Sequence, residues 1–199
     1  MSPTKPPQTL YFGYGSNLWL HQMHQRCPTS TYHGIARLKQ FRWIINARGY
    51  ANIVALQAET LTKTPSYENE VWGLIYSLSP KDEERLDRNE GVPVAYTKEM
   101  LEVEFWAVRD QDPPDVKGRS EMRSVLVYIN RILVEADKPK TEYVFRMNMG
   151  IRDALAQGVP RGYVEQVMRN FIPEDESGGD GESGKELAMK QAEDFEDGL

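Results

Sequence analysis

The residues with the clearest chemical potential lie in the stretch YFGYGSNLW at positions 11–19. Its aromatic start is short, apolar and bounded by glycine, which is typical of a buried strand. Gly13, Gly15 and the polar pair Ser16 and Asn17 follow at once. Glycine lets a backbone come close to another molecule, because it has no side chain to keep that molecule away. We therefore interpret the stretch as a loop whose backbone approaches a ligand.

A dinucleotide is the first ligand to consider, because Gly13-x-Gly15 follows a strand and precedes a helix. That fingerprint requires a third glycine at position 18, where this chain has Leu18. The sequence also lacks the regular alternation of strands and helices that a doubly wound fold needs. We therefore reject a dinucleotide site.

His21, His24 and Cys27 are the other residues that could carry chemistry near this loop. With three histidines and one cysteine in the whole chain, the two histidines have few partners and no zinc-ligand spacing. Nothing around Cys27 marks it as an activated nucleophile. We expect surface histidines, a packed thiol and no metal site.

Glu90 is the candidate acid, and it lies at the end of a well-signalled helix. Ser79 is a natural N-cap, proline is at the first helical position and Asp82 completes a capping-box pattern, so a helix is predicted over Pro80–Asn89. Gly91 is a natural stop for that helix. By position alone, Glu90 is a surface carboxylate beside a turn.

The remaining pattern predicts several strands and three further helices. Strands are expected at 9–15, 31–49, 51–59, 70–79, 96–106 and 123–130, and helices at 16–27, 141–158 and 160–172. The strand at 70–79 is apolar on both faces, as in a central strand of a closed or covered sheet. Thr141 is expected to cap the helix that follows it.

The amino-acid composition limits the classes of protein to which the chain can belong. The chain has 199 residues, 40% of them hydrophobic, which suits one domain with a sizeable core. One cysteine excludes an internal disulfide and favours a reducing compartment. The sequence shows no secretory signal, membrane-length apolar run or basic stripe, so we expect a cytoplasmic protein that binds neither membrane nor nucleic acid.

The charge is concentrated at the C-terminus. Residues 174–199 hold ten acidic and two basic side chains, a net charge of −8 in a chain of −6, so residues 1–173 carry about +2. We divide the chain into a disordered leader at 1–9, one domain at 10–173 and an acidic disordered tail at 174–199.

Deleting residues 174–199 tests this division. The tail's composition cannot bury enough apolar surface to order itself, so the deletion should leave activity and melting temperature nearly unchanged. Thermal denaturation and an activity assay of the truncated chain check this. A large drop in either would show that the tail docks on the domain.

Four motifs together resemble the gamma-glutamylcyclotransferase family. They are YFGYGSNL (11–18), EVWGLIYSL (70–78), LDRNEGV (86–92) and the run from EYVFR to VEQV (142–167). Their order and spacing match over Tyr11–Pro173, nearly the whole predicted domain. The resemblance implies an α+β fold, a small mixed β-barrel flanked by helices. It also implies an enzyme that releases 5-oxoproline from a gamma-glutamyl amino acid or amine.

The resemblance assigns roles to particular residues. Glu90 would be the catalytic acid and base. The substrate-binding residues would be Tyr14, Gly15, Ser16, Asn17, Leu18, Trp19 and Tyr143. The departures from the family pattern are Gly13, in place of the usual alanine, and the polar loop at 110–121.

These residue types suit that chemistry. Backbone N–H groups in a glycine-containing turn can bind the substrate's α-carboxylate. The substrate's own α-amine then attacks its γ-carbonyl, and one carboxylate can take the proton and return it to the leaving nitrogen. No metal, nucleotide or covalent intermediate is needed, so no cofactor is expected. We further expect burial to raise the pKa of Glu90 above its ordinary value, adding a larger increase to the small one that the helix C-terminus causes.

Other functions fit parts of the pattern. A relative acting on glutathione or on a gamma-glutamylated biosynthetic intermediate would share the motifs, although Asn17 before Leu18 and Trp19 favours the general branch. A binding module that has lost catalysis is a rival of another class, and the presence of Glu90 argues against it. A scaffold acting through the acidic tail rests on composition alone. The leaving group is left open, and so is the oligomeric state, for which the resemblance suggests a homodimer.

Overall fold

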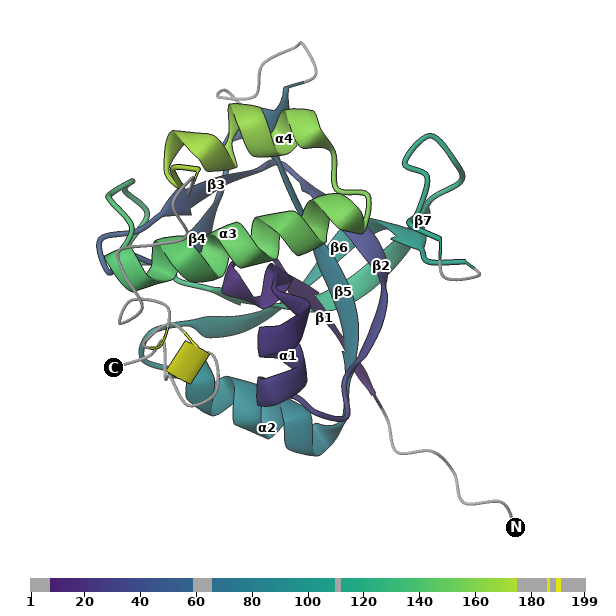
Figure 1. Cartoon of the computed structure of the whole chain (residues 1–199), viewed down its shortest axis with the longest axis horizontal. Coiled ribbons are helices and arrows are strands. Elements are labelled where there is room, and N and C mark those ends of the chain that lie inside the picture. The colour runs from purple at the N-terminus through teal and green to yellow at the C-terminus, as the bar shows by residue number, and fades with distance from the viewer. Residues whose placement is uncertain (1–7, 59–65, 110–111, 175–185, 187–188, 191–199) are drawn as a thin grey trace.

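The computed structural model describes residues 8–58, 66–109, 112–174, 186 and 189–190 (Figure 1). Residues 1–7 of the predicted leader and most of the predicted tail lie outside the described residues. Within the tail, Glu186, Met189 and Lys190 are helical and exposed. In the part of the chain that is described, no helix has the length and apolar composition that crossing a membrane requires.

Five strands close into a barrel in the order β1-β5-β2-β6-β7. They are β1 (Thr9–Gly13), β2 (Thr31–Lys39), β5 (Glu70–Leu78), β6 (Thr97–Ala107) and β7 (Glu121–Ile129). Closure is made by β1 and β7, which run parallel, whereas the other neighbours are antiparallel. The predicted mixed barrel is therefore confirmed. Two further strands, β3 (Phe41–Ile45) and β4 (Ala51–Ala55), form a separate antiparallel pair.

β5 is the central strand that its apolar faces predicted. It pairs with β1 on one side and with β2 on the other, and Val71–Leu78 are all buried. Gly73 lies so close to β1 that a Cβ there would be 2.4 Å from the carbonyl oxygen of Gly13. The missing side chain at Gly73 thus permits close packing between the two strands.

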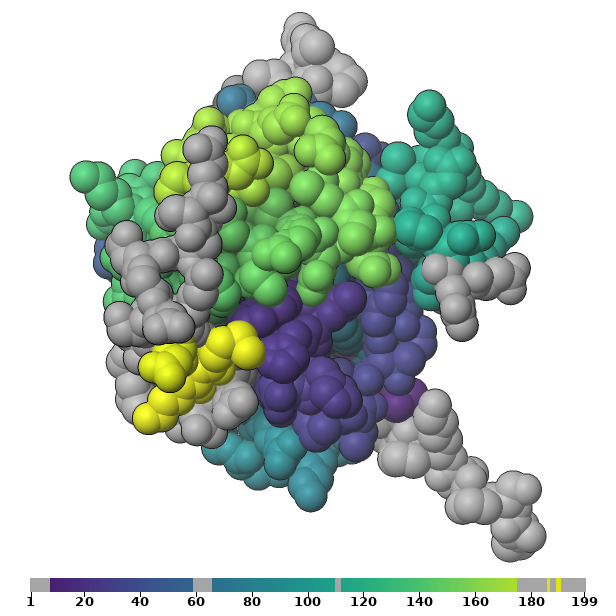
Figure 2. Space-filling view, viewed as in Figure 1, coloured from purple at the N-terminus to yellow at the C-terminus, as the bar shows by residue number. Residues whose placement is uncertain are grey.

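Between residues 8 and 174, the described part of the chain has four α-helices, which pack around the barrel (Figure 1). They are α1 (Leu20–Arg26), α2 (Pro80–Asn89), α3 (Thr141–Ala156) and α4 (Arg161–Gln166), and three-residue 3₁₀ turns lie at Ser16–Leu18 (η1), Tyr67–Asn69 (η3) and Met168–Asn170 (η4). In the space-filling view, α3 and α4 lie across the upper middle of the visible face, and α1 lies below α3 (Figure 2). Gly150 of α3 packs against Leu18 and the backbone of Trp19. The start of the YFGYGSNLW stretch belongs to the barrel and its end is held beneath α3.

Two predicted helices are interrupted. The helix expected at 16–27 consists of η1 and α1, separated by Trp19 in an extended conformation. α1 begins where Asp153 of α3 accepts the N–H of Leu20 at 2.8 Å, a tertiary contact that no local pattern reveals. The helix expected at 160–172 breaks at Val167 into α4 and η4.

Three predicted boundaries are also corrected. The strand expected at 31–49 is two strands, β2 and β3, because Gln40 turns the chain with a φ of 66°. The strand expected at 51–59 ends at Ala55, and its last residue lies outside the described part of the chain. Lys140, not Thr141, is the N-cap of α3, and it makes no side-chain capping bond.

The boundaries of α2 match the prediction. The Ser79 hydroxyl accepts the N–H of Asp82, proline occupies the first turn, and Gly91 follows the helix with a φ of 61°. A positive φ is readily adopted by glycine, which explains why the helix stops there.

Ser79→Ala should therefore destabilise the protein by about 1 kcal/mol, because the capping bond to the backbone is lost. Urea denaturation followed by circular dichroism measures the change. Ser66→Ala is a useful control, since Ser66 caps only the three-residue turn η3. Equal stability of Ser79→Ala and the wild type would contradict the capping role.

Candidate active site

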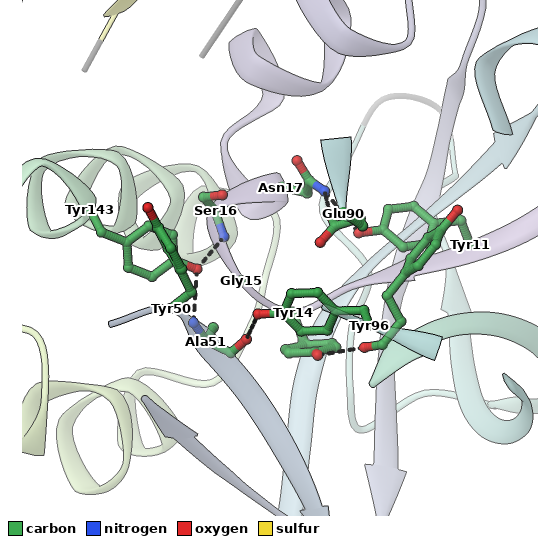
Figure 3. Close-up of a pocket in the computed structure, with 11 residues that line it drawn as sticks. Tyr11, Tyr14, Gly15, Ser16, Asn17, Tyr50, Ala51, Glu90, Tyr96 and Tyr143 are labelled. Atoms are coloured by element: carbon green, nitrogen blue, oxygen red, sulfur yellow. Dashed lines mark hydrogen bonds between the residues drawn. The ribbon is translucent and has the colours of Figure 1, made fainter. Parts of the chain in front are cut away.

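Six of the predicted site residues line one pocket (Figure 3). They are Tyr14, Gly15, Ser16, Asn17, Glu90 and Tyr143. The first four follow β1, Glu90 follows α2, and Tyr143 lies in the first turn of α3. The empty space among the lining residues is about 330 Å³, part of which is open to solvent.

Glu90 is buried, with only 8% of its surface exposed. It is the C-cap of α2, and its Oε1 accepts a hydrogen bond of 3.2 Å from the Asn17 side-chain amide. The Arg88 guanidinium donates to Glu84, one turn earlier on α2, at 3.0 Å. Position alone suggested a surface carboxylate, whereas the fold places this group inside a pocket.

The Tyr143 hydroxyl lies on the other side of the Tyr14–Asn17 loop from Glu90 (Figure 3). It accepts the backbone N–H groups of Ser16 at 3.1 Å and Ala51 at 3.3 Å. A Cβ on Gly15 would lie 2.9 Å from this hydroxyl and 3.1 Å from the Ala51 Cβ. The sequence predicted that the loop backbone comes close to a ligand at Gly15. In the structure, the groups that lie close to Gly15 are Tyr143 and Ala51 of the protein itself.

Tyr14 is held rigidly at both of its polar ends. Its hydroxyl donates to the carbonyl of Tyr128 at 2.6 Å, and its own carbonyl accepts the indole N–H of Trp43 at 2.9 Å. Burial raises the pKa of the Tyr14 phenol well above its usual range, and the negative charge of Glu90 adds to the effect. Tyr14 is therefore a neutral hydroxyl at physiological pH.

Four further tyrosines in the pocket lining were not predicted: Tyr11, Tyr50, Tyr96 and Tyr128. Tyr11 accepts a hydrogen bond of 2.9 Å from the Asn17 amide, and Tyr96 donates to the carbonyl of Ala51 at 3.0 Å. Burial, and next the charge of Glu90, raises the pKa of Tyr11 well above its usual range. Tyr11 lies within the YFGYGSNLW stretch, so that motif could have indicated it. The other three are brought together only by the fold.

Leu18 and Trp19 do not line the pocket, in contrast to the other loop residues assigned to substrate binding. Leu18 packs against Gly150 of α3, and the Trp19 ring makes an edge contact with Phe145. Both side chains are buried and anchor the loop from behind. Their apolar character explains this placement, because the pocket wall consists largely of hydroxyl and amide groups.

The rejected candidates lie where the sequence predicted. His21 and His24 are exposed on α1. Cys27 is buried, and burial raises the pKa of its thiol to about 12, so the reactive thiolate form is suppressed.

A buried carboxylate facing a loop with hydroxyl and amide groups, in a pocket that strands β1 and β7 of the closed barrel help to line, is typical of a protein that acts on a small polar molecule. Comparison with known proteins defines the class more closely. The family described as gamma-glutamyl cyclotransferase, AIG2-like, matches residues 11–142. The chain therefore belongs to this family.

Individual relatives agree with that assignment. The human gamma-glutamylcyclotransferase (Homo sapiens) is 27% identical over 170 residues, covering 85% of this chain and 81% of its own. The bovine protein of the same name (Bos taurus) is 33% identical over 88 residues, which span 42% of this chain and 44% of the relative. A solved structure of a gamma-glutamyl cyclotransferase has a TM-score of 0.63 at 23% identity, covering 92% of this chain and 99% of its own. That structure supports the fold.

Proposed function

We propose that this protein is a cofactor-independent gamma-glutamyl cyclotransferase that uses Glu90 as its general acid and base. The observation that carries the proposal is the buried Glu90 carboxylate, bonded to Asn17 of the loop in a pocket shared with Tyr143. The family and its named relatives supply the substrate class, a gamma-glutamyl compound.

The loop is proposed to hold the glutamyl part of the substrate. The backbone and hydroxyl groups at Gly15 and Ser16 would bind the α-carboxylate, since N–H and O–H donors favour an anion. The N–H of Ser16 already donates to the Tyr143 hydroxyl, so the tyrosine would share or yield this donor when a carboxylate arrives.

The proposed reaction is an intramolecular acyl transfer. The neutral α-amine of the substrate attacks its own γ-carbon, and the bond between that carbon and the leaving nitrogen breaks. Glu90 takes the proton that the attacking amine loses and returns it to the leaving nitrogen. The products are 5-oxoproline and the free amino acid or amine, and no water is consumed. Orientation of the two reacting groups within one molecule can contribute about 7 kcal/mol or more.

Glu90 fits the base role better than its neighbours do. Among the described residues that line the pocket, it is the one carboxylate, and the others that titrate are all tyrosine phenols. Burial raises the pKa of Tyr11 and Tyr14, so neither phenol accepts a proton at neutral pH. We expect burial also to raise the pKa of Glu90, which brings a carboxyl group closer to the pH at which it must exchange a proton.

Incubating the purified protein with gamma-glutamyl-alanine and measuring 5-oxoproline tests the proposal. We expect 5-oxoproline to accumulate in proportion to enzyme and time, without added metal or nucleotide. Binding of the dipeptide without turnover would instead support the binding-module alternative. The same assay with glutathione distinguishes the glutathione-acting alternative.

A further inference from the structure

A buried chain of polar side chains leads to the loop, and two of its members, Arg146 and Gln22, have no assigned role in the reaction. Its members are Arg146 of α3, Gln22 of α1 and Asn17, with exposed fractions of 0%, 0% and 3%. Arg146 donates to the Gln22 Oε1 at 3.4 Å, and the Gln22 Nε2 donates to the Asn17 Oδ1 at 2.9 Å. The Asn17 Nδ2 then donates to Glu90. The chain thus ends at the proposed catalytic carboxylate.

The direction of these hydrogen bonds is set at the Arg146 end. A guanidinium has donors and no acceptor, whereas each side-chain amide has an acceptor oxygen and a donor nitrogen. Facing Arg146, Gln22 must present its oxygen, so its nitrogen faces Asn17. Asn17 must then present its oxygen to Gln22, and its nitrogen faces Glu90. Arg26 adds to this by donating to the same Asn17 oxygen at 3.4 Å.

Ser16 is oriented by the same donors. Its hydroxyl oxygen accepts from Gln22 at 2.9 Å and from Arg146 at 3.4 Å. An oxygen that accepts two hydrogen bonds has its own proton left to donate. Since Ser16 lines the pocket, that proton suits an acceptor such as a carboxylate oxygen.

We propose that Arg146 and Gln22 are positioning residues that fix the donor direction of the loop. They make Asn17 present its N–H to Glu90 and Ser16 present its O–H to the substrate. The link to turnover rests on the proposed function, but the hydrogen-bond direction itself does not. Arg146 also lies over the Tyr143 ring, 5.0 Å from its centroid, which ties the chain to the other side of the pocket.

An N–H from Asn17 stabilises the ionised form of Glu90, whereas an Asn17 oxygen in its place would not. The pKa of Glu90 therefore reports the direction in which Asn17 points, without any substrate. Among the described residues, the titratable or charged groups that line the pocket or act on its lining include the phenols of Tyr11, Tyr14, Tyr50, Tyr96, Tyr128 and Tyr143, the Cys27 thiol, the Arg26 guanidinium beyond Asn17, and the Asp87 carboxylate, which accepts a hydrogen bond from Tyr128. Burial raises the pKa of Tyr11, Tyr14, Tyr128 and Cys27, so these groups stay protonated while carboxyl groups titrate. Guanidinium groups keep their charge throughout.

Gln22→Met and Gln22→Glu test the chain in the full-length protein. Methionine removes the donor without adding charge. An ionised glutamate has only acceptors, so it favours Asn17 with its nitrogen toward the new carboxylate and its oxygen toward Glu90, against the weaker donation from Arg26. The midpoint of the Glu90 titration, followed by ¹³C-carboxyl NMR and assigned as the resonance lost in Glu90→Gln, should move to higher pH in both. The shift should be larger in Gln22→Glu, where the acid dissociation constant falls about tenfold or more.

Gln25 offers matched controls, because it lies exposed on the same helix. Gln25→Met and Gln25→Glu should leave the midpoint unchanged. If Gln25→Glu and Gln22→Glu shifted the Glu90 midpoint equally, the added negative charge alone would explain the shift, and the proposal would be overturned. An unchanged midpoint in Gln22→Met would overturn it as well.

Arg146 provides a second pair of variants. Lysine also has donors and no acceptor, so Arg146→Lys should keep the Glu90 midpoint near that of the wild type, whereas Arg146→Met should raise it. Equal midpoints in the two variants would contradict the proposed direction. If the wild type releases no 5-oxoproline while these shifts occur, the proposed function fails and the positioning role stands. If it turns over substrate and the shifts are missing, the positioning role fails alone.

Discussion

Glu90→Gln should fold, bind substrate and lose about 10²–10⁴-fold in kcat, the range that removal of a general acid and base typically costs. Glutamine keeps the size of the side chain and an oxygen that can accept the hydrogen bond from Asn17. It cannot take the proton of the attacking amine or return it to the leaving nitrogen. The loss should therefore appear in kcat, while the Kd for a gamma-glutamyl ligand changes little. Steady-state kinetics and calorimetric binding separate the two quantities.

Glu84→Gln is the matched control for this variant. Glu84 lies on the same helix, its side chain is 71% exposed, and it contacts Arg88 instead of the pocket. Its turnover should equal that of the wild type. Near-normal turnover in Glu90→Gln would show that another group moves the proton.

Gly15→Ala should lower kcat/KM by about 10²-fold, because small displacements of reacting groups are costly in an oriented reaction. The added methyl would lie 2.9 Å from the Tyr143 hydroxyl, which would have to shift, and in tight contact with the Ala51 methyl at 3.1 Å, both in buried surroundings. Overpacking of this kind typically costs about 1–3 kcal/mol of stability, so the melting temperature should fall as well. Gly15→Val should show both effects more strongly.

Gly13→Ala separates this collision from a general intolerance of side chains in the loop. A Cβ at Gly13 has its nearest neighbours at 3.4 Å, which is ordinary van der Waals contact. This variant should keep most of the activity and stability. If Gly15→Ala kept as much activity and stability as Gly13→Ala, the lack of space at Gly15 would not matter for function.

Local signals explain which parts of the fold could be predicted. The bounds of α2 follow from Ser79, proline at the first position and Gly91, which all act within a few residues of the helix ends. The burial of β5 follows from apolar residues on both of its faces. By contrast, the start of α1 depends on Asp153, 133 residues later in the chain. No pattern around Leu20 contains that information.

The residues of the candidate site also fall into those that the local sequence indicates and those that only the folded chain brings together. Residues 14–17 are contiguous, so one motif indicated all of them, and the family resemblance added Glu90 and Tyr143. Tyr50, Tyr96 and Tyr128 lie on three separate segments that meet only when the barrel closes and the β3–β4 pair packs near it. Gln22 and Arg146 were missed for a further reason. Amphipathic spacing shows which residues of α1 and α3 are buried, but not that a buried polar side chain reaches a loop.

The most direct test of the central claim is a product analysis of the wild-type reaction with gamma-glutamyl-alanine in ¹⁸O-labelled water. Attack by the substrate's own amine predicts one 5-oxoproline for each alanine released, with no oxygen from the solvent in either product. Mass spectrometry measures both quantities in one sample. Release of glutamate carrying solvent oxygen would show hydrolysis instead of cyclisation, and release of neither product would show that the pocket does not catalyse this reaction.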